Sequence, residues 1–234
     1  MKMTFKKLMP IAASFAVLAN SASANAADIE ANVALSTDYV FRGFSQTLEE
    51  PAISGGFDYS FDNGFYLGTW GSSVDFGSEA QAEIDLYGGY GFEIDGGAEI
   101  DLSYVLYTYS GESDLNYSEF HASVSFPNNF SLGVLYSPDY FALEDADGDD
   151  LTAFVINADY SLSLSDNWGL DFHVGYTIAD EDDILVEGDD YVDYSVALTT
   201  SAKGLDFALT FYGTDIDDVD LADERVVFSI SKSF

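Results

Sequence analysis

The sequence predicts an all-β fold, a transmembrane antiparallel up-and-down β-barrel of about 12 strands. Three observations predict it. The chain opens with a leader of the secretory type, it continues as segments in which apolar and polar residues alternate with period two, and it closes on an alternating strand that ends at Phe234. Strands with one apolar face can cross a bilayer only in a closed barrel, which leaves no backbone edge unpaired in lipid.

The leader is assigned first, because it has to be removed before the fold is considered. Lys2, Lys6 and Lys7 form a positive amino-terminal region, 8–19 is an apolar core, and 24–26 reads Ala-Asn-Ala, a small-residue cleavage site. The alternative, a membrane anchor, needs about 20 apolar residues, and this stretch is shorter. We therefore expect a signal peptide at 1–26 and an outer-membrane β-barrel at 27–234.

Composition excludes several classes of function. Cleavage would remove three of the seven basic residues and none of the 42 acidic ones, so nucleic acid is excluded as a partner. The chain has no cysteine, which excludes thiol catalysis and cysteine metal sites. Such a charge would favour disorder in a polar chain, but 47% of the residues are hydrophobic and 16% are aromatic. These side chains need surfaces to pack against, so the chain folds.

The strands are placed between turn signals. Alternation is clear where Ile100, Leu102 and Tyr104 interleave with Asp101 and Ser103. The expected strands are 29–45, 52–61, 65–76, 82–92, 98–109, 117–126, 130–137, 152–162, 168–178, 191–201, 205–213 and 224–234. In the third strand, Phe65 and Leu67 have one parity whereas Trp70, Val74 and Phe76 have the other, which predicts a bulge.

The links between these strands alternate in length. Short links are expected at 62–64, 93–97, 127–129, 163–167 and 201–204, and longer, more acidic ones at 46–51, 77–81, 110–116, 138–151, 179–190 and 214–223. Short turns at one rim and long loops at the other are typical of outer-membrane barrels, and an even strand count then puts both termini on the periplasmic side. This pattern predicts the outer membrane of a Gram-negative bacterium, with membrane lipid and lipopolysaccharide as partners.

Aromatic residues near the strand ends indicate interfacial girdles. They are Tyr39, Phe41, Phe61, Phe65, Phe92, Tyr109, Phe126, Phe130 and Trp168. A water-soluble barrel or sandwich, with its apolar face inside, is the alternative that the girdles disfavour.

Three segments resemble a known family. Residues 35–47 (LSTDYVFRGFSQT), 64–76 (GFYLGTWGSSVDF) and 83–90 (EIDLYGGY) are similar to the TorF-type putative porins, which were earlier catalogued as conserved bacterial proteins of unknown function. The resemblance covers the whole mature chain and is most specific in its first third. It implies a bacterial outer-membrane barrel and carries no catalytic or binding residues over to this sequence.

Charged inward positions are the candidate pore-lining residues. Arg42 is the one arginine before the last expected strand, and its parity with Asn32, Ser36 and Asp38 puts it on the inward face. It is either part of a pore constriction, paired with inward acids, or half of a structural ion pair that fixes the lumen. The candidate acids are Asp58, Asp85, Asp101 and Asp193.

Two histidines also take inward parity. His121 and His173 lie near Glu119, Ser123 and Asp171, so a Ser-His-Asp arrangement can be considered. No G-x-S-x-G or H-E-x-x-H motif occurs, and an enzyme acting on membrane lipid needs its nucleophile within reach of the lipid face. We expect pore lining and hydrogen bonding from both histidines and no enzymatic activity.

The acidic loop 144–150 resembles the start of a calcium loop. Asp145, Asp147 and Asp149 alternate as ligands would, but the sixth position is Asp150 instead of glycine and the twelfth is Ile156. We expect a rim that collects cations loosely, or acids that simply solvate a loop, and we expect no metal site and no cofactor.

The expected function is passive passage of small solutes, with a preference for cations. The alternative is a non-conducting barrel with a structural or adhesive role. Eight strands leave an interior filled by side chains and sixteen leave an aqueous channel, so about 12 strands lie between the two. Small residues at inward positions favour some open space, and they are Gly56, Gly89, Ser103, Ser123, Ser125, Gly133, Gly169, Gly175, Ser195 and Ala197.

Overall fold

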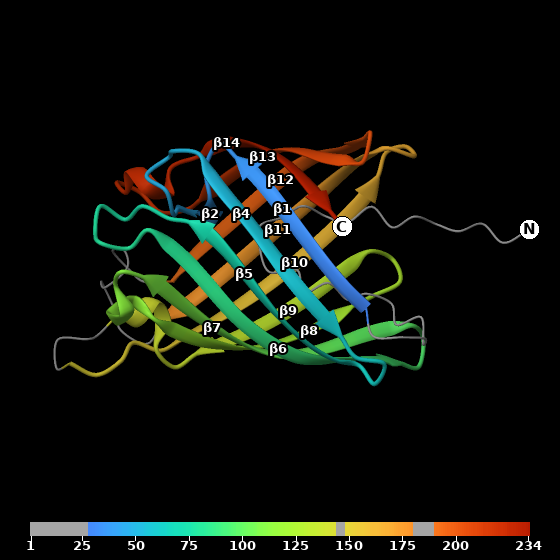
Figure 1. The fold of residues 1–234 in the computed structure, drawn as a ribbon, viewed down its shortest axis with the longest axis horizontal. Helices are drawn as coiled ribbons and strands as arrows, with labels where there is room; N and C mark the ends of the chain where they lie inside the picture. The colour runs from blue at the N-terminus through green and yellow to red at the C-terminus, as the bar shows by residue number, and fades with distance from the viewer. Residues whose placement is uncertain (1–27, 144–147, 180–189) are drawn as a thin grey trace, which may run out of the picture.

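The computed structural model describes residues 28–143, 148–179 and 190–234, and these form a closed antiparallel barrel of 12 strands. The predicted fold class is confirmed. Each barrel strand pairs with its neighbours in sequence, and β1 (Asp28–Ser36) closes the barrel against β14 (Arg225–Ser233). Figure 1 shows the strands inclined to the barrel axis. The predicted signal peptide lies outside the described residues.

The remaining strands follow the predicted ranges closely. They are β4 (Ala52–Ser60), β5 (Phe65–Ser73), β6 (Ala82–Ile94), β7 (Ala98–Ser110), β8 (Tyr117–Ser125), β9 (Phe130–Ser137), β10 (Ala153–Ser163), β11 (Trp168–Ala179), β12 (Tyr191–Ala202) and β13 (Leu205–Thr214). Three short 3-10 helices lie in the links, η1 (Ser113–Leu115), η2 (Tyr140–Ala142) and η3 (Asp220–Ala222). Among the described residues, no helix has the length and apolar character needed to cross a membrane.

The first predicted strand, 29–45, is wrong in its second half. The barrel strand β1 ends at Ser36, and the chain then forms a separate small hairpin of β2 (Val40–Phe41) and β3 (Phe44–Ser45). Tyr39 and Phe41 keep the odd parity of the apolar residues of β1, such as Val33 and Leu35, so the sequence pattern alone did not mark the break. The hairpin belongs to a two-stranded sheet of its own and not to the barrel wall.

The bulge predicted in the third barrel strand is absent. β5 pairs with β4 and β6 in unbroken register. Phe65 and Leu67 face outward and are about half exposed, whereas Trp70 and Val74 face inward and pack in a buried cluster inside the barrel. The change of parity therefore reflects apolar side chains inside the barrel and not an extra residue in the strand.

The outward faces of the strands are apolar, as expected for a wall that meets lipid. Large aliphatic and aromatic side chains there are exposed all round the barrel, among them Ile53, Leu67, Leu86, Phe120, Phe154 and Val226. Phe61, Phe65, Phe92, Phe126 and Trp168 are exposed near the short turns, in agreement with one predicted girdle. Tyr39, Phe41 and Tyr109 are not girdle residues, because all three are buried inside the barrel.

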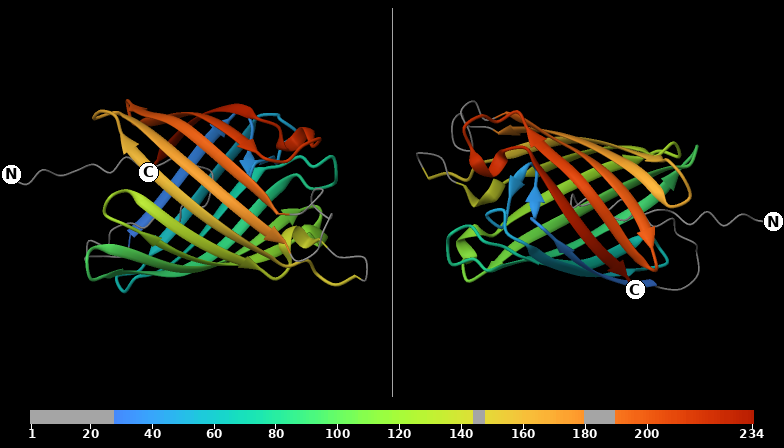
Figure 2. Two further views of the ribbon diagram at one scale, coloured as in Figure 1. Left: turned by 180° about the vertical axis from the view of Figure 1, so that it is seen from behind. Right: turned by 90° about the horizontal axis from the view of Figure 1, so that it is seen from above.

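The two ends of the barrel differ, as the link lengths predicted. The start of β1, the end of β14 and the short turns lie at one end, and the three 3-10 helices and the long links lie at the other (Figures 1 and 2). The hairpin of β2 and β3 also lies at the long-link end, between the end of β1 and the start of β4.

Candidate functional site

Residues 37–51, which we call the inward segment, connect β1 to β4. Their central part, 38–47, is largely buried inside the barrel, whereas 48–51 are exposed. The tip of its hairpin is a two-residue turn, Arg42 and Gly43, since Phe41 pairs directly with Phe44. Both turn residues have positive φ, 49° and 86°. A tight hairpin needs this conformation, which suits glycine but costs a side-chain-bearing residue such as arginine on the order of 1 kcal/mol.

The Arg42 side chain is held by a carboxylate in the barrel wall. Nη1 lies 2.7 Å from Oε1 of Glu119 and Nη2 lies 2.8 Å from Oε2, so the guanidinium binds the carboxylate with both arms. The Glu119 side chain is fully buried and that of Arg42 is 9% exposed. Burial disfavours the charged guanidinium, but Glu119 outweighs it and raises the pKa of Arg42 well above its ordinary value. The pair is therefore ionised and buried, as a structural anchor would be.

Glu119 accepts two further hydrogen bonds. The Tyr107 hydroxyl donates to Oε2 at 2.9 Å, and Nε2 of His121 lies 2.8 Å from the same oxygen. The aromatic ring of Tyr140 covers the Arg42 guanidinium, with a distance of 5.6 Å from Cζ to the ring centroid. This desolvated, fully satisfied carboxylate is the centre of the candidate site.

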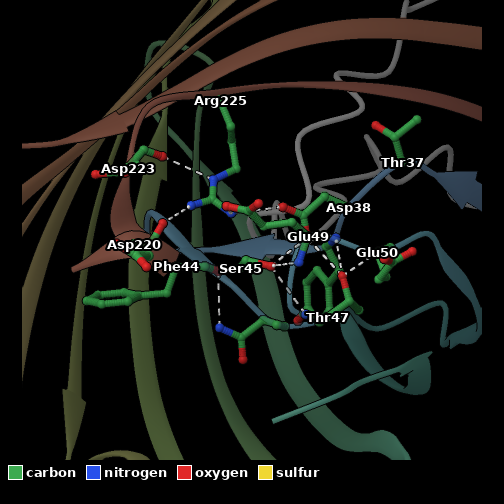
Figure 3. Close-up of polar contacts among 12 residues, drawn as sticks. Thr37, Asp38, Phe44, Ser45, Thr47, Glu49, Glu50, Asp220, Asp223 and Arg225 are labelled. Carbon is green, nitrogen blue, oxygen red and sulfur yellow. Dashed lines mark hydrogen bonds and ion pairs between the residues drawn. The ribbon is translucent and has the colours of Figure 1, made fainter. Parts of the chain in front are cut away.

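A second anchor ties the base of the inward segment to the last strand (Figure 3). Asp38 accepts hydrogen bonds from the hydroxyls of Ser45 and Thr47, at 2.7 and 2.8 Å. Its other oxygen lies 3.1 Å from Nη1 of Arg225. Arg225 also donates to the carbonyl oxygens of Asp220 and Asp223, which fixes its guanidinium between the inward segment and η3. Both ends of the hairpin are thus held by buried arginine–carboxylate pairs.

Aromatic rings fill the space between the inward segment and the wall. Phe41 packs against Tyr107 on β7 and Phe141 in η2, both with ring centroids 6.0 Å away. On the opposite side, Phe44 packs edge-on against Tyr191 of β12 at 5.6 Å. Contacts from the hairpin therefore reach strands on opposite sides of the lumen, and with η2 the inward segment occupies the long-link end of the barrel.

Two carboxyl groups lie beneath the inward segment on β6. Glu83 and Asp85 share the inward face and are almost completely buried. The Tyr39 hydroxyl is 3.3 Å from Oε1 of Glu83. Burial and the nearby Glu83 and Asp85 raise the pKa of Tyr39, so its phenol keeps the proton that it donates. Asp85, predicted to line a pore, is thus buried on the inner wall near Tyr39 of the inward segment.

The other half of the lumen is polar and contains a cavity of about 170 Å³. Its walls come mainly from β8 to β12, and the lining includes Asp101, His121, Ser123, Asn157, Asp159 and His173. Asp101 accepts a hydrogen bond of 3.0 Å from Tyr66. Three of the predicted site residues, Asp101, His121 and His173, therefore meet at one cavity, and Glu119 lies directly behind His121.

His173 is placed between two carboxylates. Nδ1 lies 2.7 Å from Oδ1 of Asp159 and Nε2 lies 3.2 Å from Oδ1 of Asp193. Both ring nitrogens are engaged, so neither is free to accept a proton from a serine hydroxyl, as a catalytic triad would require. Asp193 was a predicted site residue and is 4% exposed, whereas Asp159 was not singled out from the sequence.

The other predicted residues lie apart from this cavity. Asp58 on β4 is half-buried and accepts a hydrogen bond from Tyr87. Asp145 and Asp147 lie outside the described residues, and Asp149 lies in an exposed loop. No group of three His, Asp or Glu side chains in the described ranges is arranged to hold a metal ion.

Several inward glycines make room for side chains instead of leaving open space. A Cβ at Gly68 would lie 2.6 Å from Cζ of Tyr87, and one at Gly89 would lie 2.6 Å from Cζ of Tyr66. Gly133 differs, because a Cβ there would have only ordinary contacts at 3.8 Å or more. The expectation of open space holds beside the cavity, where Gly133, Ser123 and Ser195 lie, but not on β5 and β6.

Glu119 and Arg225 are the residues that sequence reasoning missed. The parity of Arg42 put it on an inward face and suggested Asp58, Asp85, Asp101 or Asp193 as partners, but its partner is Glu119. One signal was present: Arg42-Gly43, with Val40-Phe41 before it and Phe44 after it, has the form of a two-residue hairpin turn. No sequence signal identifies Glu119, because its pairing joins residues 77 positions apart.

Comparisons with known proteins concern the family and the fold. A model of a bacterial protein family of unknown function, Gcw_chp, matches residues 19–234. No curated protein matches the chain. Among solved structures, the KdgM porin aligns with a TM-score of 0.52 and 10% identity over 89% of this chain and 98% of that one. The NanC porin aligns with a TM-score of 0.55 and 8% identity over 87% and 98%. At these identities the likeness concerns the fold.

Proposed function

Because this chain belongs to the Gcw_chp family of bacterial proteins of unknown function, its activity must be argued from its own structure, and we propose that it is an outer-membrane channel for small cationic and neutral solutes. The apolar outer wall, the girdle at the short turns and the porin-like fold support a place in the outer membrane of a Gram-negative bacterium. The resemblance of residues 35–90 to TorF-type putative porins points the same way.

The charge of the lumen is the observation that carries the proposal. Acidic side chains on inward faces of the described strands include Glu30, Asp58, Glu83, Asp85, Glu99, Asp101, Glu119, Asp159, Asp171, Asp193 and Asp206. Arg42 and Arg225 are the arginines that face them, and both are already paired with Glu119 and Asp38. Carboxylates lining a passage with low-dielectric walls concentrate cations within it.

The same charge defines which solutes are disfavoured. One solved structure of the KdgM porin is described as a complex with oligogalacturonate, an acidic sugar chain. An acidic solute entering the lumen of this chain would meet carboxylates with no free arginine among the described residues to bind it. We therefore propose cations and neutral polar solutes as the substrates, with the serine, asparagine and aspartate side chains of the cavity as their contacts.

The orientation follows from the ends of the barrel. We propose that both termini and the short turns face the periplasm and that the long links face outward, as in outer-membrane barrels generally. The signal peptide at 1–26 would direct the chain there. Membrane lipid and lipopolysaccharide are the partners of the apolar wall, and no enzymatic activity is proposed.

A non-conducting barrel is the second candidate, and the inward segment is the observation that favours it. Two anchors and a ring of aromatic contacts fill the long-link end of the lumen. Such a barrel would serve a structural or adhesive role through its loops.

Planar-bilayer recordings distinguish the two functions. Refolded protein under a KCl gradient should give a reversal potential of the sign expected for cations, and Asp159→Asn with Asp171→Asn should reduce it. The loop change Asp114→Asn is the matched control, since Asp114 is exposed in a long link and salt screens exposed charges over about 8 Å. An anion-selective current would contradict the proposal. Absence of current from both the parent protein and a variant lacking residues 38–50 would favour the non-conducting barrel.

A further inference from the structure

We propose that the Glu119 pocket is a guanidinium-binding site of the lumen, that Arg42 occupies it as a tethered ligand, and that a solute bearing a guanidinium group competes with Arg42 for it. The inference deepens the proposed function by naming a solute class, and it rests on that function only for the solute's route to the pocket. Everything else about the site follows from the contacts of Glu119.

The pocket has the chemistry of a guanidinium site. Both carboxylate oxygens accept from the guanidinium arms, at 2.7 and 2.8 Å, and Tyr107 and His121 hold Oε2 in place. The guanidinium carbon of Arg42 lies over the Tyr140 ring, 5.6 Å from its centroid. A planar fork that binds two oxygens and presents a face to an aromatic ring matches this arrangement, whereas an ammonium ion offers neither feature.

The ligand now in the pocket comes from the inward segment and not from the wall. Glu119 is on β8, Tyr107 on β7 and Tyr140 in η2, so the pocket is complete apart from the Arg42 side chain and the Phe41 ring beside it. Arg42 stands at the tip of the hairpin with φ of 49°. Because Arg42 lies in the hairpin turn and not in a wall strand, its side chain can leave Glu119 without breaking the strand pairing of the barrel.

A route to the pocket is visible from the cavity. His121 lines the cavity and also contacts Oε2 of Glu119, so one side chain separates the open part of the lumen from the pocket. A cation attracted into the cavity by Asp101 and Asp159 would therefore lie one residue from Glu119. Binding there excludes Arg42, so the solute shifts the population towards a displaced hairpin.

Direct binding tests the site without reference to conduction. Equilibrium dialysis of folded barrel in detergent, at constant ionic strength, should show saturable binding of methylguanidinium, with methylammonium binding at least tenfold more weakly. Arg42→Ala removes the competing side chain and should tighten methylguanidinium binding at least tenfold. Glu119→Gln should abolish it, and Asp62→Asn, which removes one charge from an exposed short turn, should leave it within twofold of the parent.

Displacement of the hairpin has its own readout. The chain has two tryptophans, and Trp70 packs edge-on against Tyr39 of the inward segment at 5.4 Å. In a Trp168→Phe background, Trp70 emission should change with methylguanidinium over the same concentration range as binding. In the Arg42→Ala variant, Trp70 emission without any ligand should already match that of the parent protein saturated with methylguanidinium.

The outcomes separate this inference from the proposed function. Equal affinity for methylguanidinium and methylammonium, or unchanged binding in Glu119→Gln, would overturn the site even if the barrel conducts cations. Binding without conduction would keep the site and refute the channel. If Arg42→Ala does not fold, Arg42→Lys serves instead, because its single ammonium should compete less well and still tighten methylguanidinium binding severalfold.

Discussion

Asp38 and Arg225 are 187 positions apart in the chain, yet Oδ2 of the first lies 3.1 Å from Nη1 of the second inside the barrel. The pair joins the link after the first barrel strand to the start of the last one. Both side chains are about nine-tenths buried. This contact and the Arg42–Glu119 pair determine how firmly the inward segment is held.

Loss of the Arg225 anchor should loosen the inward segment. Arg225→Ala leaves Asp38 buried with only hydroxyl donors, and breaking a buried ion pair in this way costs about 3 kcal/mol. We expect cleavage by an added protease within residues 37–51 while the barrel itself stays resistant to SDS until heated. Lys232→Ala, which changes an outward lysine, is the control and should leave that segment protected. Equal protection of both variants would show that Arg225 is not an anchor.

A disulfide should lock the hairpin to the wall. A Cβ on Gly43 would lie 3.6 Å from Cβ of Thr214, within the range that a disulfide spans, and the chain has no cysteine of its own. Oxidised Gly43→Cys/Thr214→Cys protein should conduct less than the parent and recover on reduction. The single variant Gly43→Cys controls for strain at a residue with positive φ. Identical conductance in both redox states would mean that the hairpin does not move during conduction.

A charged side chain should destabilise the barrel more on the outward face of a strand than on the lumen face. Leu86→Arg puts a cation on the lipid face of β6 and should cost roughly 2–4 kcal/mol of unfolding free energy near the bilayer centre. Ser123→Arg, at the cavity and opposite Asp101, should cost far less and should shift the reversal potential towards anions. Urea unfolding in liposomes measures the first effect. A soluble barrel with its apolar face inside would show the opposite order.

Two inward glycines should respond differently to the same substitution. Gly68→Ala places a methyl group against Tyr87 and Asp58, which forces the Tyr87 ring to shift and costs about 1–3 kcal/mol. Gly133→Ala meets only ordinary contacts and should change the unfolding free energy by less than about 0.5 kcal/mol. The unfolding midpoints in urea compare the two variants directly. Equal losses of unfolding free energy in the two variants would mean that the Tyr87 ring does not need the space left by the missing side chain of Gly68.

The ends of the barrel can be assigned by labelling. Single cysteines at Asp114 and Asp218, in long links, should react with an impermeant reagent on intact cells. Cysteines at Asn63 and Lys203, in short turns, should react only after the outer membrane is opened. Labelling of Asn63 on intact cells would reverse the proposed orientation.

Barrel strands were predictable because each has an apolar face towards lipid and a more polar face towards the lumen. Successive side chains point to opposite faces, so the sequence alternates with period two. It recovered β6 to β14 within a few residues, together with the alternation of short and long links. The inward segment obeys a different requirement. Tyr39, Phe41, Trp70 and Val74 are apolar because they pack against one another inside the barrel, so their parity was misread as part of a wall strand and as a bulge.

The candidate site was predictable only in part, for a similar reason. Inward parity located Asp101, His121 and His173, which meet at the cavity. Parity did not identify which carboxylate pairs with Arg42. The pairing of Arg42 with Glu119 depends on where the hairpin turns inside the closed barrel, and this depends on contacts with strands on opposite sides of the lumen.

The position of Arg225 also has a consequence for assembly. β14 is the last strand of the chain, and it closes the barrel by pairing with β1, the first. Joining the two ends of so long a chain is entropically the most demanding contact in the molecule, so it forms late. Asp38 has no arginine to meet until that seam is closed. We therefore expect docking of the hairpin to be a final step and the barrel interior to stay accessible to water until the wall around it is complete.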